Sequence, residues 1–152
     1  MSAAEAVQAL AARYLVAWNG RDFEGMAACF AGPNAFAYPG GLRVSEDGAA
    51  LAAALRRRFA RMEAEGFDRA EVDRVEVRMA SDDLAVIDLP GLRRLRADGS
   101  EIAAFDGMYL AVRTAEGWRL ALGAAGDLGW RERGALVSRA PAAARSCEAG
   151  AA

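Results

Sequence analysis

The sequence predicts an α+β domain in which three N-terminal helices pack on one face of a mainly antiparallel sheet. Two patterns predict this fold class. In the first half of the chain, apolar residues recur at three- and four-residue steps, which is the spacing of helices. In the second half, apolar and polar residues alternate between turn signals, which is typical of an antiparallel meander. Helices followed by such a meander bury their apolar sides against each other as two layers.

The first helix is predicted from Ser2 to Asn19-Gly20. Ser2 and Glu5 form an S-x-x-E capping box, in which each side chain accepts a hydrogen bond from the other residue's backbone N–H. The apolar face of this helix then follows at helical spacing: Val7, Leu10, Ala11, Tyr14 and Trp18.

A second, shorter helix is predicted after Asp22, which is a candidate N-cap. Its apolar edge consists of Phe23, Met26 and Phe30. The following segment, 32–41 (GPNAFAYPGG), is too rich in Gly and Pro for a helix. We expect a loop or a short edge strand there.

The third helix begins at Ser45 or Asp47 and closes at Gly66. Its apolar residues recur at steps of four, four and three: Leu51, Leu55, Phe59 and Met62. The basic run 56–58 lies within this helix, and we expect it to form a solvated face.

The strands are predicted from alternation and from two turns. Residues 75–79 alternate between apolar and charged side chains, and 84–89 form a second strand. Asp98-Gly99 is a strong hairpin signal, and 115–117 is a second turn. The last strand then places four apolar residues on one side: Trp118, Leu120, Leu122 and Ala124.

One carboxylate interrupts an apolar strand face. In 102–112 (IAAFDGMYLAV), Asp106 falls on the same side as a set of apolar residues: Ile102, Ala104, Met108, Leu110 and Val112. We expect this side to face the interior, where lost hydration raises the pKa of a carboxyl group. Alternatively, Asp106 pairs with an arginine, or a bulge at Gly107 turns it to solvent.

The 152-residue length suits one domain, which we place at 1–127. Residues 128–152 are rich in Ala and Arg and lack a periodic pattern, so we expect a mobile tail. Trp130 and Leu136 are candidates to hold the start of this tail against the domain.

The composition excludes several kinds of site. The chain has no histidine, and all 19 basic residues are arginine. These absences exclude Ser–His and Cys–His nucleophile pairs, histidine-rich metal sites and lysine Schiff bases. Cys29 and Cys147 lie far apart without companion ligands, so neither a disulfide framework nor a zinc site is indicated. We expect no metal and no cofactor.

The charge and hydropathy patterns indicate a cytoplasmic protein. The net charge of −2 does not suggest a nucleic-acid partner. No apolar run approaches the length of about 20 residues that a membrane span needs. The N-terminus lacks the basic segment and apolar core of a secretory signal.

Two segments resemble the nuclear transport factor 2-like superfamily. Residues 13–31 (RYLVAWNGRDFEGMAACFA) are similar to its helix-turn-helix opening, and 115–122 (AEGWRLAL) are similar to its final hairpin and strand. The resemblance implies a cone-shaped α+β barrel, in which three helices pack on the concave face of a curved sheet and a deep apolar pocket lies between them. Its members include ketosteroid isomerases and SnoaL-like polyketide cyclases.

The resemblance also implies site residues. In the isomerase branch, a helix tyrosine and a late-strand carboxyl group hold the steroid oxyanion, and an aspartate before the third helix carries the proton. Tyr14 and Asp106 stand at the first two positions, and Tyr38 stands at the third. A phenol with a pKa near 10 is a poor base at neutral pH, which argues against the standard isomerase reaction. Asp106, as acid/base or oxyanion donor, and Tyr14 are therefore the candidate catalytic residues.

Six further residues are candidates for pocket lining, and filling of the core is the alternative role for each: Trp18, Phe30, Tyr38, Phe59, Met62 and Met108. The opposite face of the late strands is small or aromatic and needs cover. The resemblance implies a homodimer through this face, which contains Phe105, Tyr109, Ala111 and Ala121.

The predicted function is that of a SnoaL-like protein with an apolar pocket for a small, oxygen-bearing ring compound. Isomerase or cyclase chemistry at Asp106 and Tyr14 is the candidate activity. The alternative is a non-catalytic dimeric module for interaction or ligand sensing.

Overall fold

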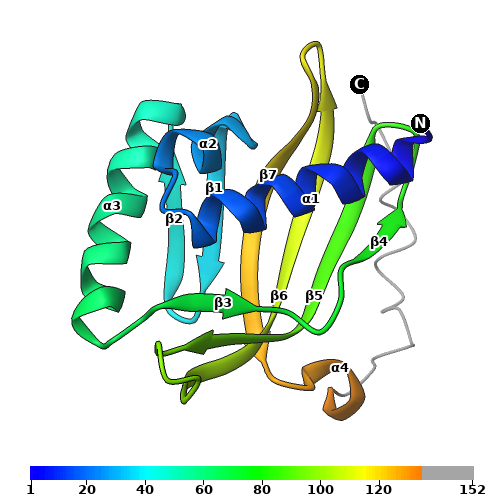
Figure 1. Cartoon of the computed structure of the whole chain (residues 1–152). Helices are drawn as coiled ribbons and strands as arrows, with labels where there is room; N and C mark the ends of the chain where they lie inside the picture. The colour runs from blue at the N-terminus through cyan, green and yellow to red at the C-terminus, as the bar shows by residue number, and fades with distance from the viewer. Residues whose placement is uncertain (135–152) are drawn as a thin grey trace.

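The computed structural model describes residues 1–134, in which a curved seven-stranded sheet carries three helices on one face (Figure 1). The helices are α1 (Ala3–Asn19), α2 (Phe23–Ala28), α3 (Gly48–Ala64) and the short C-terminal α4 (Trp130–Arg133). The strands are β1 (Phe30–Tyr38), β2 (Gly41–Ser45), β3 (Arg69–Glu71), β4 (Glu76–Met79), β5 (Leu84–Leu95), β6 (Glu101–Thr114) and β7 (Gly117–Asp127). The predicted α+β class is confirmed.

The helix starts follow the predicted caps. Ser2 Oγ accepts a hydrogen bond from the Glu5 N–H at 3.2 Å, and the Glu5 carboxylate accepts one from the Ser2 N–H at 2.6 Å. Asp22 caps α2. Asp47, not Ser45, caps α3 by accepting a hydrogen bond from a backbone N–H in its first turn. These side chains satisfy N–H groups that have no partner within a helix.

The sheet order is β2-β1-β7-β6-β5-β3, and β4 pairs with β5 beside β3. Only β1 and β7 pair in parallel within this part of the chain. The predicted turn at Asp98-Gly99 joins β5 to β6, and Gly99 adopts a φ of +84° that favours glycine. The turn before β7 likewise has Gly117 at a φ of +101°.

The prediction for 32–41 is wrong in one respect. Instead of a loop or a short edge strand, the segment forms most of β1 and its hairpin with β2, and β1 lies inside the sheet between β2 and β7. Pro33 is compatible with this position because the register of β1 with β7 is interrupted between Phe30 and Ala35, and pairing with β2 starts only at Asn34.

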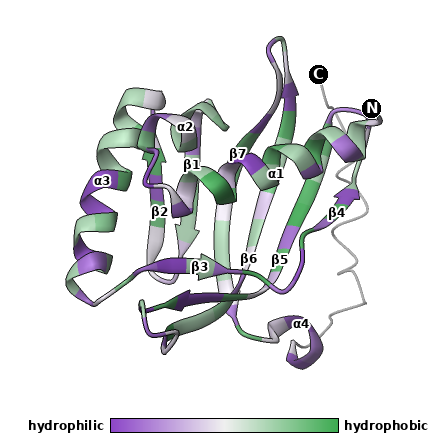
Figure 2. Ribbon diagram, in the orientation of Figure 1, coloured by the Kyte–Doolittle hydropathy of each residue, from purple (hydrophilic) through white to green (hydrophobic). Residues whose placement is uncertain are grey.

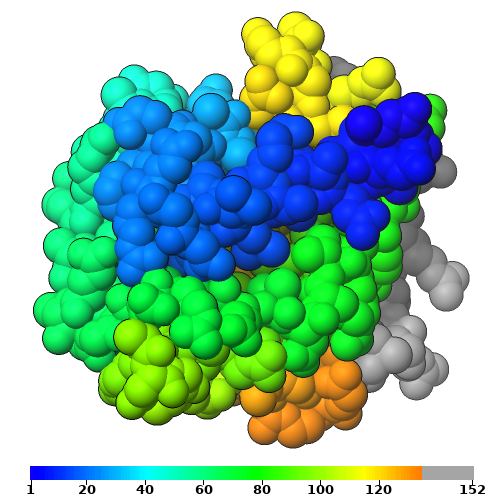
Figure 3. Space-filling model, viewed as in Figure 1, coloured from blue at the N-terminus to red at the C-terminus, as the bar shows by residue number. Residues whose placement is uncertain are grey.

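The core lies between the helices and the sheet. Figure 2 shows apolar residues along α1 and the central strands, and Figure 3 shows α1 and α2 lying across this face. An aromatic cluster forms its centre, with ring centroids 4.7 Å apart for Trp18 and Phe59 and 5.3 Å apart for Phe23 and Phe59. No helix within residues 1–134 has the length and apolar character needed to cross a membrane.

The two faces of β6 are the reverse of those predicted. Tyr109 lies opposite the buried Ile87 of β5, and Ala111 is 0% exposed, so this side faces the interior. Asp106 and Met108 lie on the outer side. Alternation alone did not decide between the faces because both sides of β6 carry apolar residues.

The predicted dimer surface is therefore wrong in its residues. Phe105, Tyr109 and Ala111 face inward, and Ala121 lies at an irregularity in the pairing of β6 with β7. The homodimer itself stays a prediction.

Asp106 satisfies the backbone at an irregular point of β5. Between Leu89 and Leu92 this strand has one residue more than β6, and Gly91 adopts a φ of +64°. The Gly91 N–H donates to Asp106 Oδ1 at 3.0 Å, and the Gly129 N–H, just before α4, donates to Oδ2 at 3.1 Å. A carboxylate that is only 8% exposed thus joins the bulge to the C-terminal helix.

A second contact holds α4 to the same outer face. Arg131 forms an ion pair with Asp88, a β5 residue that is 2% exposed and also binds Arg78 at 2.6 Å. Trp130 lies against Gly126, as expected for a residue that holds the start of the tail. Residues 128–134 therefore belong to the folded domain, contrary to the predicted start of the tail, and Leu136 lies outside the described residues.

We predict that Asp106→Ala lowers the free energy of unfolding by about 1–3 kcal/mol, because two backbone N–H groups lose their acceptor. Asp106→Asn keeps one acceptor oxygen and should lose less. Urea denaturation measures both. Asp127→Ala, at an exposed carboxylate one strand away, is the control and should change stability by no more than about 0.5 kcal/mol. Equal stability of Asp106→Ala and the control would contradict the prediction.

Candidate functional site

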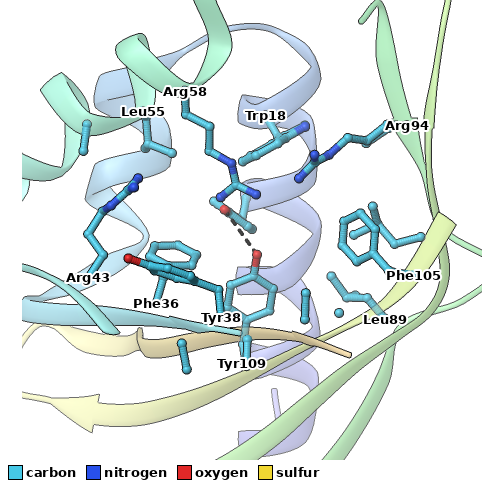
Figure 4. Close-up of a pocket in the computed structure, with 18 of the residues that line it drawn as sticks. Trp18, Phe36, Tyr38, Arg43, Leu55, Arg58, Leu89, Arg94, Phe105 and Tyr109 are labelled. Atoms are coloured by element: carbon cyan, nitrogen blue, oxygen red, sulfur yellow. Dashed lines mark hydrogen bonds between the residues drawn. The ribbon is translucent and has the colours of Figure 1, made fainter. Parts of the chain in front are cut away.

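A pocket of about 260 Å³ lies between α1, α3 and the inner face of the sheet (Figure 4). Its walls are mainly apolar: Trp18, Phe36, Leu55, Leu89, Leu92 and Phe105. Tyr38 and Arg43, both exposed, lie at its mouth on the β1–β2 hairpin. The pocket combines an apolar body with a few polar groups, as small-molecule sites do.

Two tyrosines meet inside this pocket. Tyr14 of α1 is 2% exposed, and the Tyr109 hydroxyl of β6 donates to the Tyr14 hydroxyl at 3.3 Å. This distance is longer than the usual 2.7–2.8 Å of an O–H···O bond, so the contact is weak. One of the two O–H groups donates in this contact, so the other remains a donor for another group.

Burial raises the pKa of Tyr14 well above 10 and also raises the pKa of Tyr109. The positive charge of Arg58 lowers the pKa of both groups, but burial has the larger effect. Both phenols are therefore neutral at pH 7. They can donate hydrogen bonds, but they are poor bases.

Four arginines line the same pocket: Arg43 of β2, Arg58 and Arg61 of α3, and Arg94 of β5. No aspartate or glutamate within residues 1–134 lines it. Within that part of the chain, none of the four forms a salt bridge. The lining therefore carries four positive charges and, among residues 1–134, no negatively charged side chain.

Two of these arginines point inward beside aromatic rings. The Arg58 guanidinium lies 5.3 Å from the Trp18 ring centroid, and that of Arg94 lies 5.0 Å from the Phe105 ring centroid. Figure 4 shows both head groups pointing toward the same region beside Trp18. Burial lowers the pKa of Arg94, and the like charge of Arg58 lowers it further.

Two buried nitrogen donors belong to the same region. Trp18 Nε1 and Arg94 Nε are buried and have no hydrogen-bond partner among the described residues. Together with the tyrosine hydroxyls and the guanidinium groups, they make the pocket rich in donors and poor in side-chain acceptors.

Three of the predicted site residues line the pocket, namely Tyr14, Trp18 and Tyr38. Three others, Phe30, Phe59 and Met62, are buried in the core and are absent from the lining. Phe30 supports the pocket from behind, with its ring centroid 5.4 Å from that of Tyr14.

The expected pairing of Asp106 with Tyr14 is wrong. Asp106 and Met108 lie on the outer side of β6, where Asp106 borders a cavity of about 30 Å³ beside α4. The physical reason is the demand of the carboxylate for donors, which the bulge of β5 and the start of α4 supply on that side.

Sequence reasoning missed the inward-facing Phe105, Tyr109, Arg58 and Arg94. A signal existed for Arg58, which lies three residues after Leu55 and therefore on the apolar side of α3. The run 56–58 is thus not uniformly solvated. Its other two arginines are exposed, whereas Arg58 is half-buried.

Among residues 1–134, no three aspartate, glutamate or cysteine side chains gather closely enough to hold a metal ion.

Comparisons with known proteins agree with this architecture. The family described as "NTF2-like protein (DUF6841)" matches residues 4–127. An NTF2-like protein with a cystatin-like fold from Novosphingobium aromaticivorans is 21% identical, with a TM-score of 0.65, over 93% of this chain and 85% of its own. A domain of unknown function with a cystatin-like fold from Nostoc punctiforme is 24% identical, with a TM-score of 0.66, over 88% and 82% of the two chains.

A ketosteroid isomerase-like protein from Erwinia carotovora atroseptica is 23% identical, with a TM-score of 0.60, over 80% of this chain and 93% of its own. At these identities the likeness shows the fold alone. Among curated proteins, none matches the chain. The fold and the family match over 4–127 together show that the chain belongs to the NTF2-like family.

Proposed function

We propose that this protein binds a small, oxygen-bearing ring compound in the pocket between α1, α3 and the sheet. The observation that carries the proposal is the pair of neutral tyrosine donors, Tyr14 and Tyr109, beside the apolar side chains of the pocket wall. Phenolic donors in a low-dielectric pocket bind a carbonyl or hydroxyl oxygen more strongly than they would in water. The apolar wall supplies the affinity for the ring, and the hydroxyls fix its orientation.

Binding without catalysis is the class of function that the pocket supports best. Removal of a proton from carbon needs a base with a pKa near the working pH. Among residues 1–134, the lining includes no carboxylate and no cysteine, and Tyr14 and Tyr109 have raised pKa values. The isomerase or cyclase reaction therefore has weaker support than ligand sensing or carriage.

The first prediction from the proposed function concerns ligand binding itself. We expect some members of a panel of phenols, ketones and aromatic acids to raise the melting temperature. A ligand at 100 times its Kd stabilises the native state by about 2.7 kcal/mol. Ala54→Trp fills the pocket and should abolish the shift, whereas Ala60→Trp, on the exposed side of α3, should retain it. The proposal fails if no compound shifts the wild type, or if Ala54→Trp responds as the wild type does.

The second prediction concerns the role of the Tyr14 hydroxyl. Tyr14→Phe should weaken the binding of a cyclic ketone by about 0.5–1.5 kcal/mol, which is roughly a two- to twelvefold increase in Kd. The corresponding hydrocarbon is the control ligand, because its binding does not depend on a donor. Titration calorimetry with both compounds separates the two effects. An equal loss for ketone and hydrocarbon would mean that the hydroxyl does not bind the ketone oxygen.

The third prediction concerns pH. Since burial raises the pKa of Tyr14 and Tyr109 above the value of about 10 for an unfolded tyrosine, the neutral pair stabilises the fold fully below about pH 10. This stabilisation is lost as pH rises from that value through the folded-state pKa. In Tyr38→Phe, which leaves only these two tyrosines, phenolate absorbance should appear together with the loss of circular dichroism. Phenolate absorbance at about pH 10 in a fully folded protein would contradict the raised pKa values.

A further inference from the structure

We propose that the ligand of this pocket is an organic anion, an aromatic or alicyclic ring compound whose carboxylate binds between Arg58 and Arg94. This inference deepens the proposed function and rests on it. It starts from the charge of the pocket lining, which contains four arginines and, among residues 1–134, no acidic side chain.

The charge arrangement favours an anion energetically. Arg58 and Arg94 are both half-buried, and neither forms a salt bridge within residues 1–134. Partly desolvated like charges repel each other, which is consistent with the lowered pKa of Arg94. An anion placed between two cations replaces this repulsion with two attractions.

The hydrogen-bonding groups favour an oxyanion. Trp18 Nε1 and Arg94 Nε are buried without a partner among the described residues. A carboxylate has two oxygens with about four acceptor positions and can accept two parallel bonds from one guanidinium group. A neutral carbonyl offers one oxygen and leaves more of these donors unpaired.

The aromatic rings hold the guanidinium groups in place. Arg58 lies over Trp18, and Arg94 lies over Phe105, with centroid distances of 5.3 and 5.0 Å. Stacking of this kind limits the rotation of a guanidinium group and prepares it for planar, bidentate binding of a carboxylate. The same rings, Trp18 and Phe105, form apolar walls for the ring of the ligand.

The two remaining arginines lie nearer to solvent. Arg43 and Arg61 are exposed, and Arg43 lies over the ring of Tyr38 at 5.8 Å at the mouth. Positive charge around an entrance raises the local concentration of anions and their rate of association. We assign these two residues to attraction of the ligand and assign Arg58 and Arg94 to its binding.

Titration calorimetry with naphthoate and its neutral isostere naphthamide, and with cyclohexanecarboxylate and its amide, tests the inference on the full-length protein. In the wild type, each acid should bind at least tenfold more tightly than its amide. Arg58→Gln and Arg94→Gln should each remove most of this preference, and Arg94→Lys should restore part of it because the charge remains. Arg57→Gln is the matched control, since it removes the same charge from an exposed position of α3. Circular dichroism and melting curves check that each variant is folded.

The outcomes separate the inference from the proposed function. If acid and amide bind equally and Ala54→Trp abolishes both, the pocket binds ring compounds and only the anion inference is overturned. If Arg57→Gln removes the preference as fully as Arg94→Gln does, general surface charge explains it, and the inference is again overturned. If none of the four compounds binds and no member of the wider panel of phenols and ketones binds, both the anion inference and the proposed function are overturned.

Discussion

The buried carboxylate of Asp106 needs hydrogen-bond donors, and this need determines which side chains of β6 face the pocket. Asp106 finds its donors at Gly91, in the bulge of β5, and at Gly129, before α4, and both lie on the outer side of the sheet. Side chains of a strand alternate, so this choice turns Phe105 and Tyr109 inward. The aromatic wall of the pocket and the hydroxyl that meets Tyr14 therefore depend on a residue that does not touch the pocket.

The same arrangement keeps the acidic side chains of residues 1–134 out of the pocket. Asp88 and Asp106 hold α4 on the outer side, where Arg78 and Arg131 neutralise Asp88. The inner side has arginines instead, and their cost of burial is reduced by aromatic rings rather than by carboxylates. A pocket of this kind has guanidinium groups that no acidic side chain of residues 1–134 neutralises, and this feature distinguishes it from an ordinary apolar cavity.

Local signals in the sequence were sufficient for α1, α2 and α3 and for the turns at 98–99 and 115–117, because each depends on residues within a few positions of one another. They did not give the hairpin of β1 with β2, where 32–41 was predicted to be a loop or a short edge strand. The resemblance of 13–31 to a known family gave the fold as a whole. The faces of β6 were not predictable from alternation, since both of its sides are largely apolar and the bulge that decides between them lies in β5. The inward direction of Arg58 was available from its helical position, but the run 56–58 was predicted to form a solvated face of the helix.

Because arginines are the charged side chains of the pocket among residues 1–134, the charge of the pocket does not depend on pH near neutrality. Guanidinium groups and buried phenols keep the same protonation state between about pH 5 and pH 9, and the chain has no histidine to titrate in that range. The charge presented to a ligand is therefore constant over the physiological range. For the proposed ligand, we therefore expect any dependence of binding on pH in this range to originate in the ionisation of the ligand.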